Sequence, residues 1–221
     1  MEYQKNTNNT VKRGAKRATY DKDSIHKILD ACNTCFMAFM FEGKPFVQPV
    51  NFGRKGETLY IHGSLQNRMT TAILETDQIC LNVTLLDGLI LTRSAFHHSV
   101  NYRSVVVFGK PVELKTNEEK LEGLEALINH FIPDRWQHCR KPTDDELKAT
   151  RVIAIDIISA SAKTKNTPPN DNPEDMNLDF WAGVIPVKTI PDMPVSDEKI
   201  DPSMPIPEHV LAYYERNKNG F

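Results

Sequence analysis

A hydroxyl residue, an amide and a cation follow one another where a predicted strand gives way to a predicted helix. Ser64 ends the strand pattern, and Asn67 and Arg68 open the helix pattern. Backbone N–H groups at a helix start, a hydroxyl and a guanidinium can converge on one phosphate group. Arg68 is equally consistent with a solvated helix residue. The spacing therefore indicates an anion site, with a plain surface helix as the alternative.

The common catalytic and metal-binding motifs are absent from the sequence. It contains no glycine-rich phosphate loop, GxSxG elbow, HExxH helix or EF-hand, so the usual hydrolase and nucleotide-binding folds have no motif support. Cys32 and Cys35 form a CxxC, but no second short-spaced pair is available for zinc, and buried small side chains are favoured. His97 and His98 are adjacent on a predicted strand and face opposite sides, so no shared metal ion is expected.

Hydrophobic periodicity predicts the elements that must position these residues. The strand patterns are joined by short turns, which favours antiparallel neighbours. A break is predicted near Asp87 and Gly88, and Gly109 to Pro111 is predicted to form a bulge or a sheet edge. Asn117 is the predicted cap of the clearest helix. Strands are predicted over 36–41, 46–52, 58–64, 79–91, 102–114 and 151–158, and helices over 24–33, 67–75, 117–132 and 144–150.

About six strands without regular strand–helix alternation exclude a doubly wound sheet. A closed or split antiparallel β-barrel fits better, because closure removes exposed sheet edges. The predicted fold class is mainly β with peripheral helices. Three regions are expected: an N-terminal basic arm over 1–20, the barrel domain over 21–165, and a Pro-rich extension over 166–221 that is extended and wraps the barrel or a dimer partner.

Composition narrows the classes of partner. The 221 residues carry 27 basic and 29 acidic side chains, for a net charge of −2, which argues against general nucleic-acid binding. No apolar run is long enough for a membrane span. The polar N-terminus lacks the apolar core of a secretory signal, so a cytoplasmic location is expected. The basic cluster of Lys12, Arg13, Lys16 and Arg17 is expected to be a solvated arm. Small molecules and proteins remain as partners.

Several segments in order resemble one family, the FMN-binding split-barrel proteins of the pyridoxamine-phosphate-oxidase-like superfamily. Within it, the branch of nitroimidazole-resistance flavoproteins is the most similar, and the resemblance covers nearly the whole chain. The segments are KPFVQPVNFG at 44–53, TLYIHGS at 58–64, YRSVVVFG at 102–109, RGAKRATYD at 13–21, Lys163 after the last barrel strand, and WAGVIP at 181–186.

The resemblance implies a homodimer with FMN at the interface, where both subunits contribute to each site. Val50, Asn51 and Phe52 would line the flavin ring and present backbone groups to its polar edge. Ser64, Asn67 and Arg68 would hold the phosphate, Tyr102, Arg103 and Ser104 would face the site, and Trp181 would cover the ring or the dimer seam. Met69 stands where the family often has a second basic residue, so Arg103 or Lys163 would have to replace it. His62 would lie beside the flavin as a proton donor.

The implied function is an FMN-dependent oxidoreductase that acts on a small planar substrate, with nitroaromatic reduction as the specific version. A non-catalytic flavin or haem carrier or sensor is the alternative class. Oxidation of pyridoxamine phosphate is less favoured, because no second basic cluster is evident for the phosphate of that substrate. For His62, a buried structural imidazole is an equal alternative, and Asn51, Tyr102, Ser104 and Trp181 each have a structural alternative too.

Overall fold

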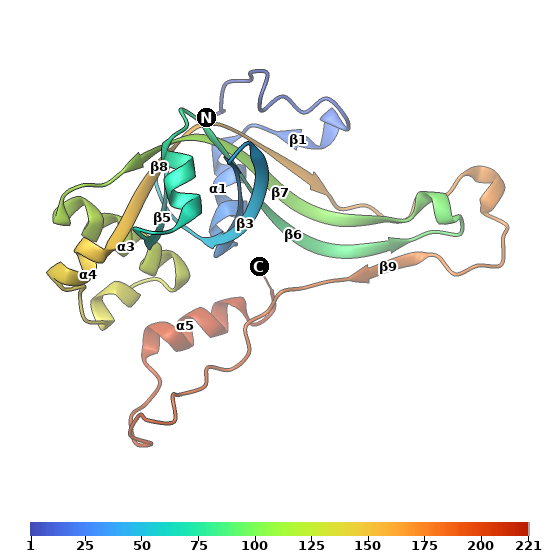
Figure 1. The fold of residues 1–221 in the computed structure, drawn as a ribbon. Coiled ribbons are helices and arrows are strands. Elements are labelled where there is room, and N and C mark those ends of the chain that lie inside the picture. The colour runs from blue at the N-terminus through green and yellow to red at the C-terminus, as the bar shows by residue number, and fades with distance from the viewer. Residues whose placement is uncertain (221) are drawn as a thin grey trace.

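Within residues 1–220, which the computed structural model describes, nine strands form one antiparallel sheet (Figure 1). Its hydrogen-bonded order is β3-β2-β6-β7-β8-β5-β4, with β1 added to β8 and β9 added to β6. The strands are β1 (Ala18–Thr19), β2 (Thr34–Phe41), β3 (Lys44–Asn51), β4 (Gly53–Lys55), β5 (Thr58–Ser64), β6 (Ile79–Leu91), β7 (Ser99–Glu113), β8 (Thr150–Lys165) and β9 (Gly183–Pro186).

The predicted mainly β fold with antiparallel strands is confirmed, and its six predicted strands are present. The sheet is not a ring of hydrogen bonds, because the order ends at β3 and β4, although β3 and β5 contact each other. The predicted bulge is present as a register shift at Phe108 and Gly109. The break predicted near Asp87 and Gly88 is present as a shift of register between Leu86 and Gly88, within a strand that continues to Leu91. β8 continues seven residues beyond the predicted end, to Lys165.

Among residues 1–220, five α-helices lie around the sheet: α1 (Lys22–Asp30), α2 (Arg68–Leu74), α3 (Asn117–Phe131), α4 (Asp144–Ala149) and α5 (Glu208–Asn217). The first four match the predicted helices. The cap of α3 is Thr116 rather than Asn117: the Thr116 side chain accepts a hydrogen bond from the Glu119 amide, and the Glu119 carboxylate bonds back in a capping box. This reciprocal arrangement satisfies two amides that would otherwise lack partners.

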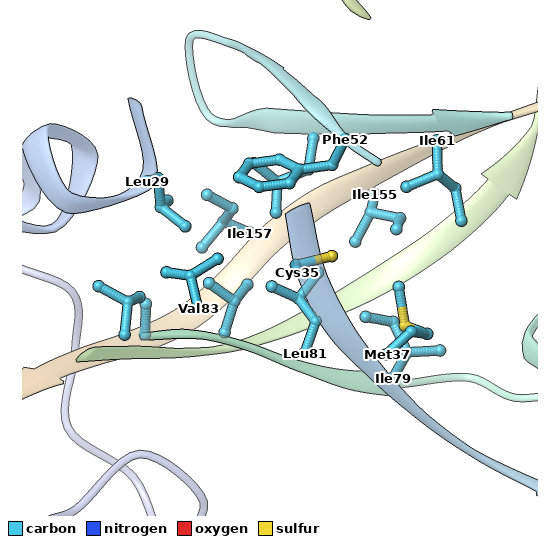
Figure 2. Close-up of a cluster of buried hydrophobic side chains, with 14 of the residues drawn as sticks. Leu29, Cys35, Met37, Phe52, Ile61, Ile79, Leu81, Val83, Ile155 and Ile157 are labelled. Carbon is cyan, nitrogen blue, oxygen red and sulfur yellow. The ribbon is translucent and has the colours of Figure 1, made fainter. Parts of the chain in front are cut away.

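The core lies inside the curved sheet, and α1 closes one side of it (Figure 2). Leu29 from α1, Leu81 from β6 and Ile155 from β8 are fully buried. Cys35 is also fully buried, and burial raises the pKa of its thiol to about 12. The thiols of Cys32 and Cys35 are therefore protonated at neutral pH and belong to the packed interior, as predicted.

Both terminal regions have more structure than the sequence predicted. The basic side chains of the N-terminal arm are exposed as expected, but Tyr3 is in the core cluster and its hydroxyl donates to Glu57 at 2.8 Å. The C-terminal extension contains β9 and α5, neither of which was predicted as a regular element. Figure 1 shows the reason: β9 is held along a projecting arm of β6 and β7, and α5 returns toward α3 and α4 after a long irregular segment.

Candidate functional site

One face of the long strands brings together three of the predicted site residues. Directly paired residues of a sheet point to the same side. Ser104 on β7 pairs with Lys163 on β8, and two residues away Tyr102 pairs with Lys165. The alternate residues of these strands, such as Val105, are buried in the core. We call the surface that carries Tyr102, Ser104 and Lys163 the outer sheet face.

The outer sheet face combines apolar area with hydrogen-bonding groups. Phe36 on β2 and Leu86 on β6 are exposed at 45% and 41%, and Leu86 pairs with Tyr102. Lys163 Nζ donates to the Arg13 carbonyl at 2.9 Å. This contact ties the basic arm to the edge of the face. A planar ring could lie on such a surface with cations beside it.

Asn51 also reaches this face, at the end of β3, where it is exposed and pairs with Thr34. The side chains of its neighbours, Val50 and Phe52, do not reach this face. Phe52 is fully buried, with its ring 4.9 Å from the ring of His130, and Val50 packs against the core. Val50 and Phe52 could therefore contribute to a ligand site only through their backbone groups, which is the contribution that the resemblance implies.

Arg103 points away from Tyr102 and Ser104, because consecutive strand residues face opposite sides. Its guanidinium holds Asp87 through Nη2, at 2.7 Å, and Nε. This charge-assisted hydrogen bond raises the pKa of Arg103. The expected placement of Arg103 in the same site as its two neighbours is therefore not what the fold allows.

A second group of predicted residues lies where β5 ends and α2 begins, a place that we call the β5–α2 corner. Ser64 and Arg68 are exposed there. Asn67 caps the helix, since its side chain accepts hydrogen bonds from the amides of Met69 and Thr70. The Met69 side chain is 1% exposed in the core. Met69 therefore offers a ligand neither its side chain nor its capped amide, and it does not replace the second basic residue of the family.

Arg68 lies over two aromatic rings rather than over Ser64. Its guanidinium carbon is 4.5 Å from the Phe46 ring centre and 5.2 Å from that of Phe41. Such stacking holds the guanidinium plane while leaving its N–H groups at the edge available. The solvated and the anion-binding interpretations both remain compatible with this exposed position.

The sequence missed a second cation at the β5–α2 corner, Arg151 at the start of β8. It pairs with Gly63 of β5, and its Nη1 donates to Thr71 Oγ1 at 2.9 Å and Thr70 Oγ1 at 3.2 Å. It is a second basic side chain at the corner, where its Nε also pairs with Glu113 at 3.3 Å, whereas neither Arg103 nor Lys163 lies there. No motif could reveal it, because about 80 residues of sequence separate it from α2.

His62 lies next to the corner along β5, but its side chain points away from α2, because the following residue, Gly63, faces Asn67 and Thr70 of that helix and consecutive strand residues face opposite sides. His62 lies opposite Val152, is exposed in the single chain, and partial desolvation lowers the pKa of its imidazole. The ring is therefore neutral at pH 7 unless a bound anion raises its pKa.

The outer sheet face and the corner are far apart within one chain. Val152, beside His62, and Lys163 are eleven residues apart on β8, which is about 36 Å along the strand. Lys163 and the corner therefore lie near opposite ends of β8. Trp181 lies at neither of these two places. It is 68% exposed on the C-terminal extension, and its ring lies against Gly183 at the start of β9.

Two features are absent from the described residues, 1–220. No group of three or more His, Cys, Asp or Glu side chains that could hold a metal ion occurs among them. No helix in this part of the chain is long and apolar enough to cross a membrane.

Comparison with solved structures places this fold beside flavin proteins. The flavocytochrome Anf3 from Azotobacter vinelandii is 37% identical, with a TM-score of 0.85 over 91% of this chain and 94% of its own. An FAD- and haem-binding protein from Mycobacterium smegmatis is 32% identical, with a TM-score of 0.83 over 89% and 96%. A candidate 5-nitroimidazole antibiotic resistance protein from Bacteroides thetaiotaomicron is 24% identical, with a TM-score of 0.57 over 66% and 85%, and shares the fold.

Sequence comparison gives the family directly. No curated protein sequence matches the chain. The family model described as pyridoxamine 5′-phosphate oxidase matches residues 21–164, which are the strands and helices from α1 to β8. The chain therefore belongs to the pyridoxamine 5′-phosphate oxidase-like family of flavin-binding split-barrel proteins.

Proposed function

We propose that this protein is a flavin-dependent oxidoreductase that works as a homodimer. Each flavin would lie between the outer sheet face of one copy and the β5–α2 corner of the other. The observation that carries this proposal is the separation of the two groups along β8. A phosphate held at the corner would lie far along β8 from Lys163 of the same chain, whereas a two-fold dimer can bring each group to its counterpart twice.

The exposed apolar side chains of the C-terminal extension support the dimer. Phe180, Trp181, Met193 and Val195 are 64%, 68%, 54% and 94% exposed. Such a density of exposed large apolar residues is unusual on a monomer and is typical of an interface. The long irregular segment before α5 (Figure 1) would wrap the second copy and bury these side chains.

The chain's own residues fit a flavin in their chemistry. Phe36 and Leu86 offer apolar area for the ring, and Ser104 and Lys163 offer hydrogen-bond donors beside it. At the corner, Arg68 and Arg151 would hold a phosphate. The bound flavin supplies electron or hydride transfer, while the protein supplies orientation and exclusion of water.

The expected cofactor is FMN, and the M. smegmatis relative makes FAD the alternative to test. Small planar substrates would stack on the ring, and nitroaromatic compounds are the specific class proposed. His62 would donate a proton to the reduced substrate once a nearby anion had raised its pKa.

A second candidate is a flavocytochrome that carries electrons between a flavin and a haem. It is favoured by the A. vinelandii and M. smegmatis structures, which cover most of this chain. It keeps the same flavin site and adds a second prosthetic group.

The deciding experiment is purification of the full-length protein followed by absorption spectroscopy, mass spectrometry of the released cofactors and a turnover assay. Flavin absorbance with turnover of a reduced nicotinamide and a nitroaromatic acceptor would support the oxidoreductase. A Soret band beside the flavin bands would favour the flavocytochrome. A protein that takes up neither FMN nor FAD at saturating concentration would refute both proposals.

A further inference from the structure

A cleft of about 710 Å³ separates α5 from the barrel. Its floor comes from the end of α1, from β4 and from α3, and its roof is the side of α5 that carries Tyr213, Arg216 and Asn217. The volume lies in the range of small-molecule sites, about 300–1,000 Å³. Arg103 lines it, so the cleft opens on the side of the sheet opposite Ser104 and Lys163. It is therefore separate from the outer sheet face.

The charges that line the cleft are unbalanced. Five cationic side chains border it, Lys27, Arg54, Lys55, Arg103 and Arg216, against two carboxylates, Asp30 and Glu125. A lining with an excess of three positive charges attracts anions, and low-dielectric walls strengthen the attraction.

Two of these cations form no salt bridge with a carboxylate of residues 1–220. Three of the cations form salt bridges: Arg54 with Asp30, Lys55 with Glu122 at 2.8 Å, and Arg103 with Asp87. Lys27 and Arg216, in contrast, form no salt bridge within residues 1–220. One belongs to α1 on the floor and the other to α5 on the roof, so an anion in the cleft could meet both.

The roof also offers an aromatic surface. Tyr213 lines the cleft, and the Arg216 guanidinium carbon lies 6.0 Å from the centre of its ring. A planar group could stack on this tyrosine while its anionic end reaches the two cations. Pro133 and Ala126 add apolar floor beneath it.

We propose that the cleft under α5 is a second ligand site, for an organic diphosphate of nucleotide size, with Lys27 and Arg216 as the anion-binding pair and Tyr213 as the stacking surface. This site is additional to the proposed flavin site, since it lies on the other side of the sheet. A ligand bound there would also hold α5 against the barrel.

The test uses full-length protein loaded with flavin, titrated calorimetrically with ADP and, separately, with inorganic pyrophosphate. The key variant is Arg216→Glu. Its matched control is Lys218→Glu, the same change of charge at the C-cap of the same helix, at a residue that pairs with Glu215 and does not line the cleft. We expect ADP to bind more tightly than pyrophosphate, and Arg216→Glu to weaken ADP binding at least about tenfold, as loss of one charged hydrogen bond would. Lys218→Glu should change it less than about twofold.

Absence of ADP binding at millimolar concentration would overturn the proposal, and so would equal weakening by the two variants, which would indicate only a long-range charge effect. A third variant, Lys27→Ala, reaches the site from the floor and should weaken ADP binding without touching α5. Flavin content, read by absorbance in the same samples, keeps the flavin proposal separately testable.

Discussion

At the residue scale, the pair Arg68 and Arg151 gives the sharpest prediction about the flavin site. Arg68→Ala and Arg151→Ala should each weaken flavin binding by about 1.5–3 kcal/mol, because each removes a charged hydrogen bond to a phosphate. The measurement is quenching of flavin fluorescence during titration of the apoprotein. FMN and FAD should be compared, since both carry a phosphate on the ribityl chain.

The control for this prediction is Arg140→Ala, an exposed arginine that pairs with Glu146 on α4. It should leave flavin affinity unchanged. Arg68→Ala also removes a cation from two aromatic rings, so thermal unfolding of each variant must accompany the titration. A folded Arg68→Ala protein with wild-type affinity would contradict the assignment.

Individual residues also show what a sequence motif can and cannot predict. The resemblance implies that Ser104 faces the flavin site and that Lys163 helps to hold the phosphate, whereas the fold pairs Lys163 with Ser104 across β7 and β8, away from the corner. The resemblance also implies that Arg103 faces the flavin site, although strand alternation turns that side chain to the other face. Arg151 could not be found at all, because only the pairing of β8 with β5 brings it to α2.

At the element scale, Gly53 fixes how closely α3 approaches β4. A Cβ atom at this position would lie 2.5 Å from Leu127 Cα and 2.6 Å from the Ala126 carbonyl oxygen, and backbone cannot move aside easily. Gly53→Ala should therefore destabilise the protein by roughly 1–3 kcal/mol, measured by urea unfolding. Gly63→Ala is the matched comparison: its nearest neighbours, at 3.2 and 3.3 Å, are side-chain atoms of Thr70 and Asn67, and its cost should be smaller. Equal costs would show that α3 can shift.

The docking of α5 against the rest of the protein should depend on pH. The imidazoles of His138 and His209 stack with ring centres 4.2 Å apart. Desolvation, His138 and Arg135 lower the pKa of His209, opposed by Asp134. A lowered pKa means that the undocked helix binds protons more readily, so docking is favoured above about pH 6.5 and is lost as pH falls below it. Hydrogen exchange of α5 amides, corrected for intrinsic rates, should rise between pH 7.5 and pH 5.5.

The informative variant for this pH effect is His209→Phe, which keeps a ring at the stack and removes one titrating group. Its α5 exchange should change much less over the same pH range. An unchanged pH response in this variant would assign the effect to another group.

Elements with strong periodicity were predictable, and elements held by other parts of the molecule were not. The apolar spacing of α1 and α3 defines them locally. β9 is a strand only because β6 offers it a free edge. Its four residues carry no pattern that distinguishes them from the Pro-rich sequence around them.

At the scale of the whole molecule, the proposed dimer makes each flavin site from two copies, and this predicts complementation. One variant lacks the corner (Arg68→Ala with Arg151→Ala), and the other lacks the outer-face cation (Lys163→Ala). Each homodimer carries its defect in both sites and should bind flavin weakly. In a heterodimer, both defects fall in one site and the other site is intact.

Co-expression with two different affinity tags and sequential purification would isolate that heterodimer. It should bind flavin with wild-type affinity at about half of its sites, counted by absorbance against protein concentration. The two homodimers, purified in parallel, set the baseline. If the corner and the outer sheet face of one copy served the same flavin, every site of the heterodimer would carry one of the two defects, and no site would regain affinity. The stoichiometry therefore decides between a shared and a self-contained site, whichever flavin is bound.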